Sequence, residues 1–223
     1  MKSPFGTRAL PRVVVFLAAL TVLATLTYRM LRRDAELSHP RQSPLVCATD
    51  DTSKWSPLFR ARMPDVVLTA LDRTPTTLHA LAGASLTAVV FCSSRCPCSD
   101  GYAGRLRALR ETYERKGVSF VAVNSNAGES FEDLKSYAAS RAYPLPVFRD
   151  QDAVAADAMR ARVTPEAFVF TADWRLAYHG RIDDDKSGVL VRDPSLQRAL
   201  DTLLSGRPLF EKEKSALGCA IER

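Results

Sequence analysis

The sequence predicts an α/β domain in which a central sheet is covered by helices on both faces. From about Pro64 onward, strand-like and helix-like patterns alternate along the chain, which is typical of this architecture. Residues 86–91 (LTAVVF) and 118–123 (VSFVAV) are β-prone and apolar apart from Thr87 and Ser119, as strands buried on both faces are. The 223 residues, 46% of them hydrophobic and 25% charged, suit one ordinary domain with appendages.

Short apolar runs predict six strands, and helical spacing of apolar residues predicts four helices. The strands are expected at 66–71, 86–91, 118–123, 146–148, 167–170 and 176–182. The helices are expected at 99–116, 131–142, 153–160 and 194–204. In the last of these, Leu196, Ala199, Leu200 and Leu203 recur at helical intervals, so one face of the helix is expected to be buried.

The N-terminus carries an apolar segment without charge, Gly or Pro at residues 13–28, with arginines on both sides. We interpret residues 1–31 as a basic segment and an uncleaved signal anchor, whose transmembrane helix spans about 13–31. The alternative is a cleaved secretory signal, but no small-residue cleavage site follows the apolar run. The expected product is a single-pass membrane protein whose domain lies on the periplasmic or extracytoplasmic side.

Composition divides the remainder into a tether, a domain and a tail. Residues 32–63 mix Pro, Ser, Thr and charges, as linkers do, and Cys47 within them is expected to be an idle thiol. The domain is expected at 64–208, and 209–223 is a tail that carries Cys219. The net charge of +6 is concentrated beside the apolar N-terminal segment, which suits a membrane surface and gives no reason to expect nucleic-acid binding.

Five cysteines are present, and Cys92, Cys96 and Cys98 lie within seven residues. An odd count argues against a purely structural disulfide framework, so the cluster indicates redox chemistry or metal binding. It lies where the strand at 86–91 gives way to a helix. The N–H groups and dipole at a helix N-terminus favour a thiolate, which is the nucleophilic form of cysteine.

The segment FCSSRCPCSDGY (residues 91–102) resembles the active-site loop of the thioredoxin-like superfamily, in its alkyl hydroperoxide reductase/thiol-specific antioxidant (AhpC/TSA) branch and the membrane-tethered reductases near it. Cys96 follows Phe91 by five residues, and Thr164-Pro165 precedes a later strand. The segments VNSN (123–126), GRIDD (180–184) and GCAI (218–221) add to the resemblance. It implies a three-layer thioredoxin-like fold with a mixed sheet. It also implies a cis Pro165 beside the active cysteine and a Thr164 whose backbone receives an incoming peptide.

One departure from the family pattern concerns the second cysteine of the loop, where this chain has Ser99. Cys96 is therefore left with Cys98, with Cys219 or with no internal partner. A Cys96–Cys98 disulfide would close a small, strained ring, whereas Cys219 requires the tail to fold back. Cys92, at the strand end, is expected to be a packed core thiol.

We interpret the chain as a thiol–disulfide oxidoreductase with Cys96 as nucleophile, Cys98 or Cys219 as resolving cysteine, and Thr164 and Pro165 lining the site. The expected substrate is a protein disulfide or a hydroperoxide, with an external thiol as reductant and with neither cofactor nor metal. Glu166 is expected to be exposed and His179 to be a surface or edge residue.

Three alternatives to this function remain. A thiol peroxidase is favoured by Ser93, three residues before Cys96, and disfavoured by Val89, where that branch has proline. Copper binding of the Sco type is suggested by the Cys92–Cys96 spacing with His179. A non-catalytic partner-binding module is suggested by the missing second cysteine.

Overall fold

An eight-stranded sheet forms the centre of the computed structural model, which describes residues 57–59 and 61–223. The strand order is β2-β1-β5-β4-β3-β7-β8-β9, and a separate two-stranded sheet joins β10 to β6. Strands β3, β4 and β5 run parallel, whereas β7 is antiparallel to β3 and β8 is antiparallel to β7. The strands are β1 (Val67–Ala70), β2 (Pro75–Thr77), β3 (Leu86–Phe91), β4 (Val118–Asn124), β5 (Val147–Arg149), β6 (Val163–Thr164), β7 (Glu166–Thr171), β8 (Leu176–Gly180), β9 (Glu213–Lys214) and β10 (Cys219–Ala220).

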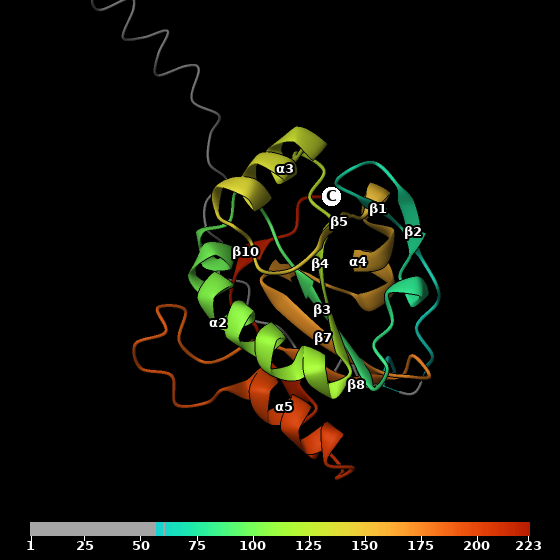
Figure 1. Cartoon of the computed structure of the whole chain (residues 1–223), viewed down its shortest axis with the longest axis vertical. Helices are drawn as coiled ribbons and strands as arrows, with labels where there is room; N and C mark the ends of the chain where they lie inside the picture. The colour runs from blue at the N-terminus through green and yellow to red at the C-terminus, as the bar shows by residue number, and fades with distance from the viewer. Residues whose placement is uncertain (1–56, 60) are drawn as a thin grey trace, which may run out of the picture. The chain divides into compact units, whose positions relative to one another are not determined.

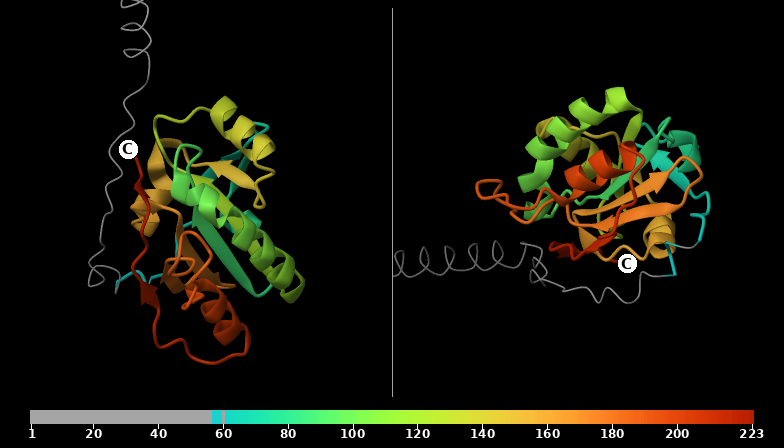
Figure 2. Two further views of the ribbon diagram at one scale, coloured as in Figure 1. Left: turned by 90° about the vertical axis from the view of Figure 1, so that its left-hand side faces the viewer. Right: turned by 90° about the horizontal axis from the view of Figure 1, so that it is seen from below.

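The helices of the described residues cover both faces of this sheet (Figures 1 and 2). They are α2 (Pro97–Tyr113), α3 (Phe131–Ser140), α4 (Val154–Met159) and α5 (Ser195–Leu204), with short 3-10 turns at His79–Leu81, Glu114–Lys116 and Gln151–Ala153. α2 and α5 pack on one face and α4 on the other. The expected three-layer arrangement and mixed sheet are therefore confirmed for this part of the chain.

Strand β3 shows how one strand serves both apolar cores. Ala88 and Val90 contribute to the core beneath α2 and α5, whereas Val89 and Phe91 contribute to the core beneath α4. Side chains of a strand alternate between its two faces. Because both faces are covered here, five of the six residues of the strand are apolar. The exception, Thr87, is buried and its hydroxyl oxygen accepts from the amide of Gly83 at 3.1 Å.

The segments that build the site described below lie at one end of the central strands, where β3 and β4 finish and β7 begins. Phe91, the last residue of β3, lies opposite Val123 of the parallel β4 and opposite Glu166, the first residue of β7. The loops that follow β3 and β4 therefore leave the sheet where the chain enters β7. Because these strand ends are neighbours in the sheet, the segments attached to them at residues 92–96, 125–130 and 163–165 lie close together.

The predicted anchor helix over 13–31 and Cys47 lie outside the described residues. Within residues 57–59 and 61–223, no helix is both long enough and apolar enough to span a membrane. The last residues assigned to the tether do contribute to the fold, because Met63 is buried and its amide donates to the carbonyl of Trp174 at 2.8 Å.

Candidate redox-active site

A disulfide joins Cys96 to Cys219 across 123 residues of sequence. Their Cα atoms are 5.9 Å apart, within the usual range for a disulfide. Cys92 and Cys98 are free thiols. The sequence left Cys96 with Cys98, with Cys219 or with no internal partner, and the structure pairs it with Cys219.

Cys96 occupies the N-cap position of α2, the long helix that follows β3. Its backbone is extended, and Pro97 is the first helical residue. Proline is common at this position because an N–H group there would have no partner within the helix. Cys96 is 2% exposed. The unpaired N–H groups and the dipole at this helix end stabilise negative charge on Cys96 Sγ once the disulfide is reduced.

The peptide bond between Thr164 and Pro165 is cis, which confirms the prediction. The carbonyl oxygen of Thr164 lies 3.0 Å from Cys96 Sγ. The bend before β7 therefore lies directly against the sulfur, as the resemblance implied.

The C-terminal tail folds back along this bend, as strand β10. Cys219 lies opposite Thr164 in the antiparallel pairing of β10 with β6, and the amide of Ile221 donates to the carbonyl of Arg162 at 2.9 Å. Gly218 makes the approach possible, because a Cβ there would lie 2.1 Å from the Thr164 carbonyl oxygen. The chain's own tail thus takes the place that the resemblance assigns to an incoming peptide.

The tail is held by several contacts besides the disulfide. Ile221 is buried in the core beneath α4. The amide of Glu222 donates to Asn126 Oδ1 at 2.9 Å, and its carbonyl accepts from the amide of Ala127 at 2.9 Å. Arg223 Nε donates to Asp157 Oδ1 at 2.7 Å. None of these contacts involves the disulfide, so we expect them to hold Cys219 close to Cys96 in the reduced chain as well.

The loop before Cys96 is held by one buried carboxylate, that of Glu129. Glu129 accepts from the hydroxyl of Ser93 at 2.6 Å, from the amide of Ser94 at 2.7 Å and from the Ser94 hydroxyl. It is 4% exposed. Sequence reasoning missed this residue, because a single Glu just before a predicted helix has the pattern of an exposed end-of-loop residue.

The VNSN segment at the end of β4 connects this loop to the tail. The side-chain amide of Asn124 donates to the Cys92 carbonyl at 3.0 Å, while Asn126 accepts from the tail at Glu222. Arg149 donates to Asn124 Oδ1 and, at 2.6 Å, to the carbonyl of Asn126. The VNSN segment, one of those that carry the family resemblance, therefore links the loop before Cys96 to the C-terminal tail by hydrogen bonds.

The GRIDD segment holds a second loop against α2 through Arg105, the ninth residue of that helix. Arg105 of α2 donates to both carboxylate oxygens of Asp183 at 2.9 and 2.8 Å and to the carbonyl of Lys186 at 2.7 Å. Burial raises the pKa of Asp183 in spite of this arginine. The loop over residues 183–190 is thereby attached to the helix that begins at Cys96.

Cys92 is the packed core thiol that the sequence predicted. It is 1% exposed in the core beneath α2 and α5. Burial raises its pKa strongly, and the negative charge of Glu129 raises it further. A thiol held in the protonated form is a poor nucleophile, so Cys92 is unsuited to exchange chemistry.

Two predictions about polar residues near the cis proline were wrong, because Glu166 and His179 are both buried. Glu166 Oε1 lies 2.6 Å from His179 Nε2, and Oε2 accepts from the amides of Arg162 and Val163 at 2.8 and 3.4 Å. The His179 ring stacks on Phe168. Buried polar groups are found paired in this way, and this pair supports the turn into the cis proline from beneath.

The sulfur atoms of Cys96, Cys98 and Cys219 all lie within 4.8 Å of one another. Thiolate sulfur is a ligand for soft metal ions, so these three residues are the candidate metal ligands of the described chain. Cys92 and His179, which the Sco-type alternative required, are not in this group.

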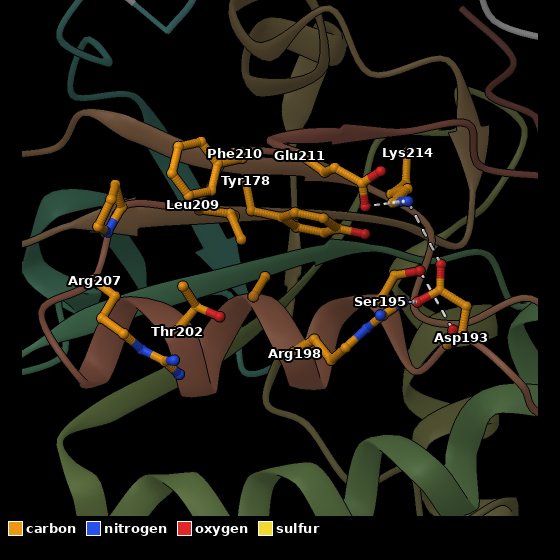
Figure 3. Close-up of a pocket in the computed structure, with 12 residues that line it drawn as sticks. Tyr178, Asp193, Ser195, Arg198, Thr202, Arg207, Leu209, Phe210, Glu211 and Lys214 are labelled. Atoms are coloured by element: carbon orange, nitrogen blue, oxygen red, sulfur yellow. Dashed lines mark hydrogen bonds and ion pairs between the residues drawn. The ribbon is translucent and has the colours of Figure 1, made fainter.

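A cavity of about 410 Å³ lies elsewhere, between α5, β8 and residues 207–214 (Figure 3). Figure 3 shows Asp193 at one end, paired with Lys214; Arg181 and Arg198 also pair with it. Burial raises the pKa of Asp193, but the hydrogen bonds from the two arginines outweigh it and leave the pKa well below its usual range. No cysteine lines this cavity.

Comparison with known proteins identifies related sequences and folds. The Redoxin family matches residues 60–200. An uncharacterized conserved protein from Geobacillus kaustophilus is 34% identical, with 73% of this chain and 90% of that chain covered and a TM-score of 0.67.

Two further solved structures share the fold at 18% identity. Peroxidoxin BcpB from Mycobacterium tuberculosis has a TM-score of 0.53, with 66% of this chain and 96% of that chain covered. A putative thiol:disulfide interchange protein DsbE from Chlorobium tepidum has a TM-score of 0.51, with 65% and 94% covered. No protein of curated function matches the sequence.

Proposed function

Since the chain belongs to the Redoxin family, we propose that it is a thiol–disulfide oxidoreductase whose redox couple is Cys96 and Cys219. The observation that carries the proposal is the disulfide between the N-cap of α2 and the tail strand that pairs beside the cis proline. This arrangement combines a sulfur stabilised as thiolate with a resolving sulfur held next to it. The uncharged run at 13–28 supports attachment to a membrane as part of the same proposal.

In the reductive direction, the Cys96 thiolate attacks one sulfur of a substrate disulfide and displaces the other as a thiolate. Cys219, as thiolate, then attacks Cys96 Sγ, forms the Cys96–Cys219 disulfide and releases the second substrate thiolate. The two released thiolates take up protons from solvent. Two electrons thus pass from the protein to the substrate.

Exposure assigns the point of attack when an external dithiol reduces the protein again. Cys219 is partly exposed, whereas Cys96 is 2% exposed. The incoming thiolate is therefore expected to bond to Cys219 Sγ and to expel Cys96 as the leaving thiolate. A better stabilised thiolate departs faster, and the N-terminus of α2 stabilises the negative charge of the thiolate that leaves.

Trapping the mixed disulfide tests the proposal. The reduced full-length Cys219→Ser variant is mixed with glutathione disulfide, and its intact mass is measured after thiols are blocked. We expect a stable glutathione adduct on Cys96, whereas the wild-type chain releases glutathione and forms its internal disulfide.

The controls are Cys96→Ser, expected to form no adduct, and Cys92→Ala, expected to behave as wild type because its thiol is buried. Turnover that survives in Cys96→Ser, or an adduct confined to Cys98, would contradict the proposed role of Cys96.

A further inference from the structure

Cys98 has no part in the exchange chemistry, yet its thiol lies with the two sulfurs that do. It occupies the second position of α2, is half-buried and is not in a disulfide. Its Sγ and those of Cys96 and Cys219 are mutually within 4.8 Å. Three convergent sulfurs are more than an exchange couple requires, so the third sulfur needs a separate explanation.

We propose that the reduced chain binds one copper(I) ion through Cys96, Cys98 and Cys219. Soft thiolate ligands favour copper(I), zinc and iron–sulfur clusters over harder metal ions. A bond of about 2.3 Å between a metal ion and a thiolate allows two sulfurs on one ion to be at most about 4.6 Å apart. The three sulfurs are already gathered close to this range, and reduction frees Cys96 and Cys219 to serve as ligands.

The cluster is expected to persist after reduction, because its parts are held independently of the disulfide. On one side, Glu129 holds the loop that precedes Cys96. On the other side, Ile221, Glu222 and Arg223 hold the tail. Preformed ligands lose little conformational entropy when they bind an ion, so this anchoring favours metal binding.

Ligand number and charge favour copper(I) over zinc. Structural zinc is almost always bound by four protein ligands, and in the described part of the chain no His, Asp, Glu or further Cys joins the three sulfurs. Three neighbouring thiolates also repel one another. The N-terminus of α2, which carries both Cys96 and Cys98, offsets part of that charge, and the bound cation offsets more.

Metal binding and disulfide formation exclude each other. A dithiol reductant supplies two electrons and two protons to the Cys96–Cys219 bond and is itself oxidised to a disulfide. Copper(I) then displaces protons from the thiols, and no electron is transferred in that step. The oxidised chain, which keeps Cys98 as the free thiol of the three, is expected to bind the ion far more weakly. This proposal does not depend on exchange activity.

Competition for copper(I) tests the site. The full-length chain is reduced, freed of reductant without oxygen, and titrated against the copper(I)–bicinchoninate complex. We expect the reduced chain to withdraw one equivalent of copper and the oxidised chain to withdraw none. Loss of an outer-shell partner already costs about 10–100-fold in metal affinity. Cys98→Ser, which removes a sulfur ligand, is therefore expected to weaken binding by at least the upper end of that range.

The matched control is Cys92→Ala, which removes the other free thiol and is expected to keep wild-type affinity. X-ray absorption of the loaded wild-type chain is expected to show three sulfur neighbours and does not depend on how any variant folds. Two sulfur neighbours in the wild-type chain, or undiminished affinity in Cys98→Ser, would overturn the proposal. So would reduced wild-type protein that withdraws no copper.

Discussion

The two segments joined by the disulfide are held to the rest of the molecule in different ways. The loop before Cys96 is held by hydrogen bonds to polar side chains, chiefly the buried carboxylate of Glu129 and the buried amide of Asn124. The tail that carries Cys219 combines strand pairing, a buried apolar side chain and an ion pair. The reactive loop is therefore held by polar side chains, whereas the resolving tail has supports of several different kinds.

This difference explains how a resolving cysteine so distant in sequence can replace a second cysteine in the loop. Closing a long chain segment costs conformational entropy. That cost is already met by the contacts of Ile221, Glu222 and Arg223 when the tail folds. Formation of the disulfide then joins two sulfurs that are already neighbours.

The largest change in stability is expected from Ile221→Ala, which removes the apolar support of the tail. Buried Ile→Ala substitutions cost about 2–5 kcal/mol, and Ile221 is 6% exposed. Denaturant unfolding of the reduced chain measures the loss. The oxidised chain is expected to lose less, because the disulfide still holds the tail.

Leu217→Ala is the matched control within the same tail, because Leu217 is 58% exposed. Exposed substitutions usually change stability by less than about 0.5 kcal/mol. Equal losses in the two variants would show that the tail is not anchored through Ile221.

A smaller change is expected from Glu129→Gln, which tests the support of the loop. The side chain of Gln has one acceptor oxygen where Glu has two, and its NH₂ group would face the Ser93 or Ser94 donors. At least one buried donor of Ser93 or Ser94 is then left without its acceptor, at a cost of about 1–3 kcal/mol. Unfolding free energies measure the loss, and faster alkylation of the Cys98 thiol is expected to accompany it.

Glu132→Gln is the neutralising control, since the Glu132 side chain is 74% exposed and pairs with the exposed Arg73. Exposed ion pairs contribute about 0–1 kcal/mol. If Glu129→Gln unfolds at the same denaturant concentration as Glu132→Gln, the buried carboxylate does not support the loop.

The smallest effect concerns the neighbouring loop over residues 183–190 at acid pH. Hydrogen bonds from the Leu190 amide and then from Ser187 lower the pKa of Asp185 from 3.8 to about 2. The folded loop thus favours the carboxylate. Its stabilising effect is complete above pH 3.8 and is lost as the pH falls through about 2. The protection of the Leu190 amide against hydrogen exchange, measured relative to the intrinsic rate at each pH, is expected to fall as the pH drops across this window.

Asp185→Asn is expected to abolish that pH step, while amides in the tail, such as that of Ile221, serve as the internal reference. A step of the same size at Ile221 would mean that the acid response belongs to the whole fold. The acid response would then not distinguish the loop over residues 183–190 from the tail.

The sequence predicted the sheet better than it predicted the site. The position of β3 at 86–91 follows from the sequence, because a nearly continuous apolar run indicates a strand covered on both faces. The two-residue strands β6 and β10 were missed, since short strands carry no periodicity and their pairing joins segments far apart in sequence.

Within the site, Cys96 and the cis Pro165 could be predicted because both lie in recognisable segments. The choice between Cys98 and Cys219 could not be made, because it depends on the register of the tail against Thr164. Glu129, Glu166 and His179 were missed or placed at the surface, since an isolated charged residue in a sequence does not show whether a buried partner exists for it.

The measurement that tests the central claim most directly is a disulfide map of the mildly oxidised full-length chain, with free thiols blocked before digestion. Trypsin releases Cys96 and Cys98 in one peptide, residues 96–105, and Cys219 in residues 215–223. Fragmentation at Pro97 then shows which of the two cysteines is bonded. We predict a Cys96–Cys219 bond with Cys92 and Cys98 blocked as free thiols, whereas a Cys96–Cys98 bond or an unbonded Cys96 would contradict the account.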